Sequence, residues 1–169
     1  MEEQIKDKPE VTIFIDVKFN GQLKCGTGTY TVVLEAMKNG EPKTKEHFYG
    51  FTNTTKNRTA IRACISAMNH LTTPCKVKLI INSRYMVQAA GQGWYKTWLY
   101  ASTNAKNEPA KNIDLWQQLS DLLDSHEVTL EYAASNTYSA YMTTMARKAG
   151  IICEDDIKSK EEQDEESNV

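Results

Sequence analysis

The change of hydrophobic period along the chain constrains the fold most strongly. Three successive segments have the apolar, β-branched character of strands: Val11–Phe19, Gly28–Met37 and Lys43–Phe51. Asn39 and Gly40 are predicted to form a hairpin turn between the last two, since both residue types tolerate the positive φ that such turns need. From Thr55 to Leu71 the apolar residues recur at helical spacing, so one face packs inward. The first half of the chain is therefore predicted to be an antiparallel three-stranded meander followed by a helix.

The second half alternates helices with short strands. Val77–Ile81 is a nearly continuous apolar run, which is typical of a central strand buried on both faces. A helical segment is predicted from Ser83 up to the glycines at 91 and 93. The remaining predicted elements are helices at Trp94–Tyr100, Ile113–Leu123 and Ala140–Ala149 and a strand at Val128–Tyr132. The order βββ-α-β-α-α-β-α indicates one α/β domain at 11–152, after a polar lead-in at 1–10.

Acidic and basic residues are divided unevenly along the chain. Between Phe51 and Asn107 there is no Asp or Glu but there are eight Lys or Arg, although the chain has 22 acidic residues. Residues 154–169 hold eight acids and two lysines, a net charge of −6, whereas the 18 bases and 14 acids of residues 1–153 give +4. The segment 153–169 is predicted to be a disordered acidic tail. It either solubilises the domain or competes with an acidic ligand for the basic body.

Composition excludes several classes of protein. A chain of 169 residues with 40% hydrophobic residues fits a single globular domain. Since no run approaches the roughly 18 apolar residues of a transmembrane helix, we expect no membrane association. The N-terminal residues MEEQIKDKPE lack the apolar core of a secretion signal, so a cytoplasmic protein is expected. The four cysteines lack metal-like spacing and are expected to be free thiols, with Cys64 on a core face.

Polar residues lie at the ends of the predicted buried elements. Asp16 lies near the C-terminal part of the first strand, where a carboxylate is costly unless it is paired or bound to metal. TTKNR at 54–58 opens a helix, LIINSRY at 79–85 closes a strand and opens a helix, and KNIDLWQQL at 111–119 opens another helix. With the order of elements, these segments resemble the type 1 ribonuclease H family from about Val11 to Gly150. The most specific of them, KNIDLWQQL, is close to the family's KNVDLWQxL.

The resemblance implies both a fold and an activity. The implied fold is the ribonuclease H-like α/β fold, a five-stranded mixed sheet of three antiparallel strands and then two parallel strands, flanked by helices. The implied activity is cleavage of the RNA strand of RNA–DNA hybrids. In the family, two Mg²⁺ ions held by four carboxylates activate a water molecule and stabilise the leaving oxygen.

The chain keeps one of the four family carboxylates. Asp16 stands at the first-strand position, whereas the family's helix Glu falls on Ala60, its strand-end Asp on Asn82 and its last Asp on Thr143. The family's loop His falls near Asn136. The acid-free stretch supplies no nearby substitute, so no intact catalytic set is predicted. No cofactor is expected either: Mg²⁺ would be needed only for residual activity, and Asp16 is the one candidate for a single weakly bound ion.

Six residues around two helix starts are predicted to bind nucleic acid: Thr55, Lys56, Asn57, Arg58, Ser83 and Arg84. Lys56 and Arg84 replace neutral residues of the family with cations, which makes this surface more attractive to phosphate. The alternative is that Thr55 and Asn57 only cap the helix and that the basic side chains are solvated.

Trp94, Tyr95 and Trp98 fall where the family carries an extra helix and a basic handle. Together with Lys96, these aromatic side chains are candidates for stacking on nucleotides or for contacting a protein partner. The alternative is that Trp94 and Trp98, which are four residues apart, pack on a neighbouring helix.

Three functions remain open from the sequence. The first is a catalytically inactive ribonuclease H-like protein, a pseudoenzyme that binds an RNA–DNA hybrid or a duplex without cutting it. The second is the same fold reused as a protein-interaction or structural subunit. The third is an active hybrid-cleaving ribonuclease with an atypical site.

Overall fold

A computed structural model describes residues 8–22, 25–101, 111–149 and 153–154. Its strands are β1 (Glu10–Gln22), β2 (Cys25–Lys38), β3 (Glu41–Thr54), β4 (Lys76–Ile81), β5 (Glu127–Tyr132) and β6 (Cys153–Glu154). Its helices are α1 (Lys56–Met68), α2 (Arg84–Gly91), α3 (Trp94–Ala101), α4 (Ile113–Asp124) and α5 (Ser139–Ala149). The predicted order of strands and helices is confirmed. Residues 1–7 of the predicted lead-in at 1–10 and residues 155–169 of the predicted tail at 153–169 lie outside the described residues.

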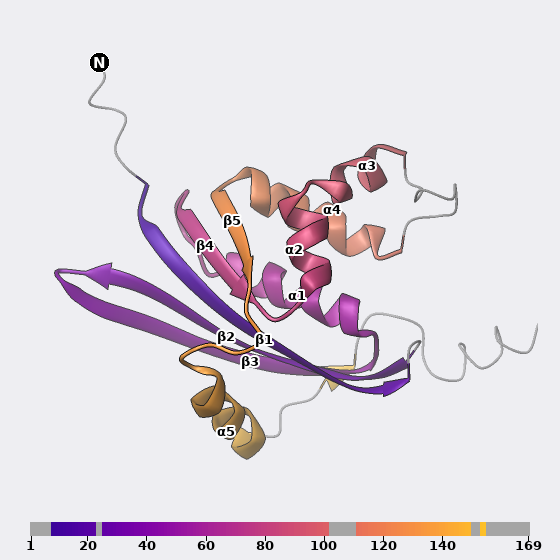
Figure 1. Ribbon diagram of the computed structural model, residues 1–169, viewed down its shortest axis with the longest axis horizontal. Helices are drawn as coiled ribbons and strands as arrows, with labels where there is room; N and C mark the ends of the chain where they lie inside the picture. The colour runs from indigo at the N-terminus through magenta and orange to yellow at the C-terminus, as the bar shows by residue number, and fades with distance from the viewer. Residues whose placement is uncertain (1–7, 23–24, 102–110, 150–152, 155–169) are drawn as a thin grey trace, which may run out of the picture.

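The five predicted strands form one mixed sheet in the order β5-β4-β1-β2-β3 (Figure 1). β1, β2 and β3 pair antiparallel, and β4 and β5 add in parallel on the other side of β1. Asn39 and Gly40 turn the β2–β3 hairpin with φ of 55° and 80°. The sheet implied by the resemblance is therefore confirmed. The short strand β6, which pairs in parallel with Phe51 and Thr52 of β3, was not predicted because two residues carry no detectable period.

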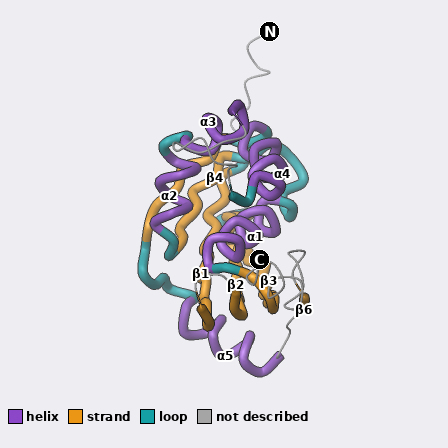
Figure 2. Tube along the Cα trace, turned by 90° about the vertical axis from the view of Figure 1, so that its right-hand side faces the viewer, coloured by secondary structure: helices purple, strands orange, loops and turns teal. Residues whose placement is uncertain are grey.

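The helices are unequally shared between the two faces of the sheet. α1 lies over β1 and β2, α2 lies over β4 and β5, and α3 and α4 pack against these helices on the same side. α5 lies on the opposite face, against β2 and β3, as Figures 1 and 2 show. Among the described residues, no helix combines the length and the apolar character needed to cross a bilayer.

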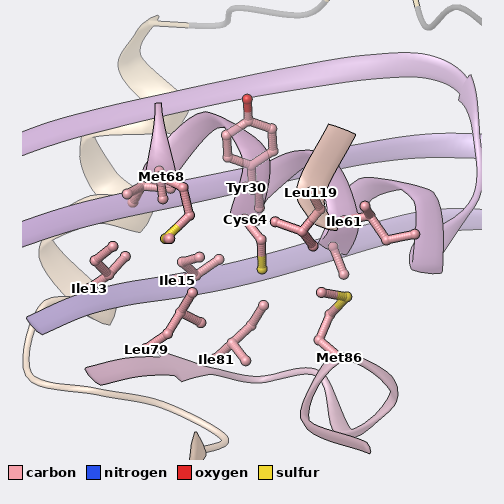
Figure 3. Packing of buried hydrophobic residues seen from close by; sticks show 14 of the residues in the cluster. Ile13, Ile15, Tyr30, Ile61, Cys64, Met68, Leu79, Ile81, Met86 and Leu119 are labelled. Carbon is pink, nitrogen blue, oxygen red and sulfur yellow. The ribbon is translucent and has the colours of Figure 1, made fainter. Parts of the chain in front are cut away.

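The hydrophobic core lies between the sheet and α1. Ile13 and Ile15 of β1 and Ile81 of β4 face Ile61 and Met68 of α1 (Figure 3), and all five side chains are 0% exposed. Burying an aliphatic side chain of this size stabilises the fold by about 1.5–3 kcal/mol. Side chains alternate between the two faces along β1, so Asp16 lies on the face opposite to these isoleucines, toward α5.

Two of the predicted free thiols are confirmed. Cys64 of α1 and Cys75, which precedes β4, are both buried, and neither forms a disulfide. Burial raises the pKa of the Cys64 thiol to about 12, so this side chain stays protonated and packs as an apolar group at neutral pH.

The first turn of α1 lies close against β2. An added Cβ at Gly28 would lie 2.0 Å from the Oγ1 atom of Thr59, in the first turn of α1. The same hydroxyl donates a hydrogen bond of 2.7 Å to the Thr55 carbonyl oxygen. Only glycine at position 28 leaves room for this arrangement, which fixes the start of α1 above the sheet.

We therefore expect Gly28→Ala to lower the free energy of unfolding by about 1–3 kcal/mol through overpacking against α1. Thermal or urea unfolding measures this loss. Gly91→Ala is the control, since a Cβ at Gly91 meets no atom within 4 Å and should leave stability close to that of the wild type. In the Thr59→Ala background the effect of Gly28→Ala should be smaller, and an equal loss in both backgrounds would contradict the contact.

Candidate functional site

Asp16 lies on β1 at the face of the sheet that α5 covers. Its side chain is 8% exposed, and the Nδ2 atom of Asn136, in the loop before α5, donates a weak hydrogen bond of 3.4 Å to Asp16 Oδ1. Asn136 therefore lies beside the carboxylate, as the family's loop residue would. A neutral amide, however, stabilises a carboxylate without bringing a further charge.

The side chain of Asn82 pairs with the backbone of β1. Val17 N–H donates to Asn82 Oδ1 at 2.8 Å, and Asn82 Nδ2 donates to the Val17 carbonyl oxygen at 3.0 Å. Ile81 is the last residue of β4 in the parallel ladder with β1, where it pairs with Ile15. The Asn82 amide thus acts as one further peptide group of that ladder. An aspartate could replace its acceptor but not its donor.

Ala60 lies in the buried face of α1. Its side chain is 1% exposed and belongs to the hydrophobic core. A methyl group supplies no ligand atom, and a longer acidic side chain here would have to leave the core or be buried as a charge.

Thr143 of α5 is joined to β1 by a lysine. Lys18 Nζ donates a hydrogen bond of 2.8 Å to Thr143 Oγ1. Lys18 follows Asp16 by two residues on the same strand, so both side chains project from the same face. A cation therefore lies at the position where the resemblance implies a metal-binding carboxylate. The sequence prediction missed Lys18, although its spacing from Asp16 was the available signal.

These four positions do not fit a pair of Mg²⁺ ions. Mg²⁺ needs several hard oxygen ligands in near-octahedral geometry, and two ions bring four positive charges. Asp16 supplies one carboxylate, while Lys18 places a positive charge beside Thr143. Across the described part of the chain, no group of three or more His, Cys, Asp or Glu side chains is arranged to hold a metal.

Two of the predicted binding residues cap helices. Thr55 is the N-cap of α1, where its Oγ1 accepts the Arg58 N–H at 3.1 Å. Ser83 is the N-cap of α2, where its Oγ accepts the Met86 N–H at 3.2 Å. Capping is therefore the role that the structure gives to both hydroxyls.

Arg58 joins α1 to α4. The side chain is 5% exposed, and its guanidinium forms a two-pronged ion pair with Asp114, with distances of 3.2 and 2.8 Å. It also donates to Asn112 Oδ1 at 3.2 Å. The Asp114 side chain at the other end of this ion pair is 53% exposed, so the pair joins a buried guanidinium to the surface at the start of α4. The Arg58 guanidinium contacts Asp114 and Asn112 within the protein, and its contact with nucleic acid stays a prediction.

Lys56 and Arg84, the two other cations at the helix starts, are exposed. Lys56 and Asn57 lie in the first turn of α1, and Arg84 begins α2 with its Cζ atom 3.9 Å from the centroid of the Tyr132 ring. The Asn82–Val17 pair brings the start of α2 to β1. The start of α1 lies over Gly28, which pairs with Phe19 of β1. Two residues of β1, or about 7 Å, separate these anchor points, so both helix starts lie beside the C-terminal half of β1.

The aromatic segment of α3 is largely used for packing. Tyr95 is 4% exposed and stacks on Trp116 with ring centroids 5.2 Å apart. Trp98 contacts the same indole edge-on at 5.8 Å. The alternative in which Trp94 and Trp98 pack on a neighbouring helix is confirmed for Trp98, whereas Trp94 is 45% exposed.

Comparisons with known proteins agree on one family. The family described as RNase H matches residues 8–135. The ribonuclease H of Lachnoclostridium phytofermentans is 31% identical over 156 residues, which cover 88% of this chain and 98% of that protein.

Two solved structures share the fold. LC9-RNase H1, a type 1 RNase H with the type 2 active-site motif, superposes with a TM-score of 0.71 at 22% identity and covers 85% of this chain and 74% of its own. A foamy viral protease-reverse transcriptase in complex with an RNA/DNA hybrid has a TM-score of 0.63 at 16% identity, over 81% of this chain and 19% of its own.

Restoring the family's acidic residue at position 82 is expected to lower the stability of the folded protein. Asn82→Asp removes the donor to the Val17 carbonyl and brings a carboxylate toward that oxygen, which should cost about 1–3 kcal/mol of the free energy of unfolding at neutral pH. Asn57→Asp is the matched control, because an exposed acid in the first turn of α1 should be neutral or slightly stabilising. Chemical unfolding of the three proteins measures the difference, and equal stability of Asn82→Asp and the wild type would contradict the role of the amide.

Proposed function

The chain belongs to the ribonuclease H family, and we propose that it binds an RNA–DNA hybrid or a nucleic-acid duplex without cleaving it. The observation that carries this proposal is the hydrogen bond of 2.8 Å between Lys18 and Thr143. It places an ammonium group where two-metal hydrolysis needs a carboxylate.

Loss of cleavage is supported by the charge of the four family positions. Asp16 contributes one negative charge, and Ala60, Asn82 and Thr143 contribute none. Lys18, which lines the same pocket as Asp16, brings an equal positive charge, so no excess of negative charge remains there to attract Mg²⁺. A water molecule at this site would lack the metal that lowers its pKa enough to make it a nucleophile.

Retained binding is supported by the two helix starts beside β1. α1 and α2 have no acidic residue in their first turns, and Lys56 and Arg84 are exposed there. Backbone N–H groups and the positive end of each helix dipole favour a phosphate at such a position. The similar foamy viral structure is a complex with an RNA/DNA hybrid, which supports the choice of ligand class.

Incubation of the full chain with a labelled RNA–DNA hybrid and Mg²⁺ or Mn²⁺ should yield no cleavage products, because the two-metal ligand set is incomplete. Denaturing gel electrophoresis of the RNA strand measures the outcome. Metal-dependent products that disappear in Asp16→Asn would overturn the proposal and identify an active nuclease with an atypical site.

The hybrid should bind at low salt, with an affinity that falls steeply as salt rises. The Lys56→Gln/Arg84→Gln double variant should bind more weakly and reduce the slope of log affinity against log salt by about two if each cation contacts one phosphate. Lys43→Gln is the control, since Lys43 lies far along the β2–β3 hairpin, 3.5 Å from Glu41. Fluorescence anisotropy measures all three proteins. Absence of binding by the wild type at low salt would contradict the proposed function.

A further inference from the structure

A pocket of about 370 Å³ lies between α5 and the face of the sheet that carries Asp16. This volume is far above the roughly 10–15 Å³ that one water molecule requires. Lys18 lines it from β1, and Arg147 lines it from the last turn of α5. The charged side chains in the lining are these two cations and Asp16, so the pocket carries a net positive charge.

The pocket offers hydrogen-bond donors as well as charge. The Lys18 ammonium has three donors, and its contact with Thr143 uses one of them. The Thr143 hydroxyl, which accepts that bond, keeps its own hydrogen as a donor. Thr29 and Thr31 of β2 add two further hydroxyl groups to the lining. Oxygens of a singly charged anion match this combination of cations and hydroxyls.

One feature of the pocket opposes an anion. Asp16 carries a negative charge on the same wall, but it is 8% exposed and accepts a hydrogen bond from Asn136. Its carboxylate is therefore set back from the solvent-facing part of the pocket, whereas Lys18 and Arg147 are exposed. The accessible charge is the positive one.

We infer that the Lys18 ammonium holds a phosphate group at the place where the family binds its metal ions. This ammonium, with Thr143 and Arg147, binds one phosphodiester group of the nucleic acid directly, so the grip on the backbone requires no divalent ion. This inference rests on the proposed function and deepens it, because it states how a strand is held at a site that no longer cuts.

The test compares affinities for a labelled hybrid in EDTA and in Mg²⁺ at matched ionic strength. Wild-type affinity should be the same in both conditions. Lys18→Gln keeps an amide donor for Thr143 but removes the charge. It should weaken binding about tenfold near ~0.1 M salt and reduce the salt slope by about one, with an unchanged melting temperature. Lys43→Gln, a charge-matched control away from the pocket, should bind as the wild type does.

The outcomes separate the inference from the proposed function. Wild-type binding that Lys18→Gln leaves unchanged overturns the inference alone, as does wild-type binding that needs Mg²⁺. No wild-type binding in either condition overturns both. Arg147→Gln is a second variant with the same expected direction, and a loss confined to Lys18→Gln and Arg147→Gln supports the pocket as the place of contact.

Inorganic phosphate distinguishes a nucleic-acid phosphate from a free one. If phosphate raises the melting temperature no more than chloride does at equal ionic strength, this result supports a phosphodiester of the bound strand as the ligand of the pocket. A rise that depends on Lys18 would assign the pocket to free phosphate and overturn the nucleic-acid part of the inference.

Discussion

β1 and β4 pair in parallel, and the side-chain amide of Asn82 extends that pairing by one residue to Val17. β1 is central because the hairpin strands lie on one side of it and the parallel strands on the other. The amide satisfies both backbone groups of Val17, each of which would cost about 1–3 kcal/mol if it were left buried and unpaired. It also fixes where β4 ends and where α2 starts. The family has a metal-binding Asp at this position, whereas the Asn82 side chain of this chain joins β4 to β1.

The chemistry of the site follows from this change of role. With Asn82 turned to the backbone, Asp16 has a neutral amide from Asn136 on one side and Lys18 two residues along the strand. The Lys18 ammonium donates a hydrogen bond to Thr143 of α5, which holds it between β1 and α5. It places a fixed positive charge where the family binds metal ions. Fixed charge can bind a phosphate, but it cannot generate a hydroxide nucleophile. The proposed function therefore separates binding from cleavage, which share one set of ligands in a two-metal enzyme.

Much of the fold could be predicted because it depends on local signals. The period change after β3 and the Asn39–Gly40 turn predicted the elements, and the sequence placed the start of one helix at Thr55 and of the next at Ser83. Contacts across the chain could not be predicted in this way. Arg58 is buried and forms an ion pair with Asp114, 56 residues away, which no local pattern indicates. The contact of Lys18 with Thr143 could not be predicted, because Thr143 lies 125 residues away on a helix whose position against the sheet no local pattern gives.

The most direct test of the account is Mn²⁺ binding by the free protein, measured by electron paramagnetic resonance with calorimetry on the same samples. Mn²⁺ and Mg²⁺ both favour carboxylate, carbonyl and water oxygens, and Mn²⁺ reports its own binding spectroscopically. With one carboxylate left and an ammonium beside it, the chain is predicted to show no stoichiometric site up to about 1 mM Mn²⁺, a concentration that fills moderately weak sites. Stoichiometric binding that disappears in Asp16→Asn would contradict the claim that Lys18 has replaced the metal ions.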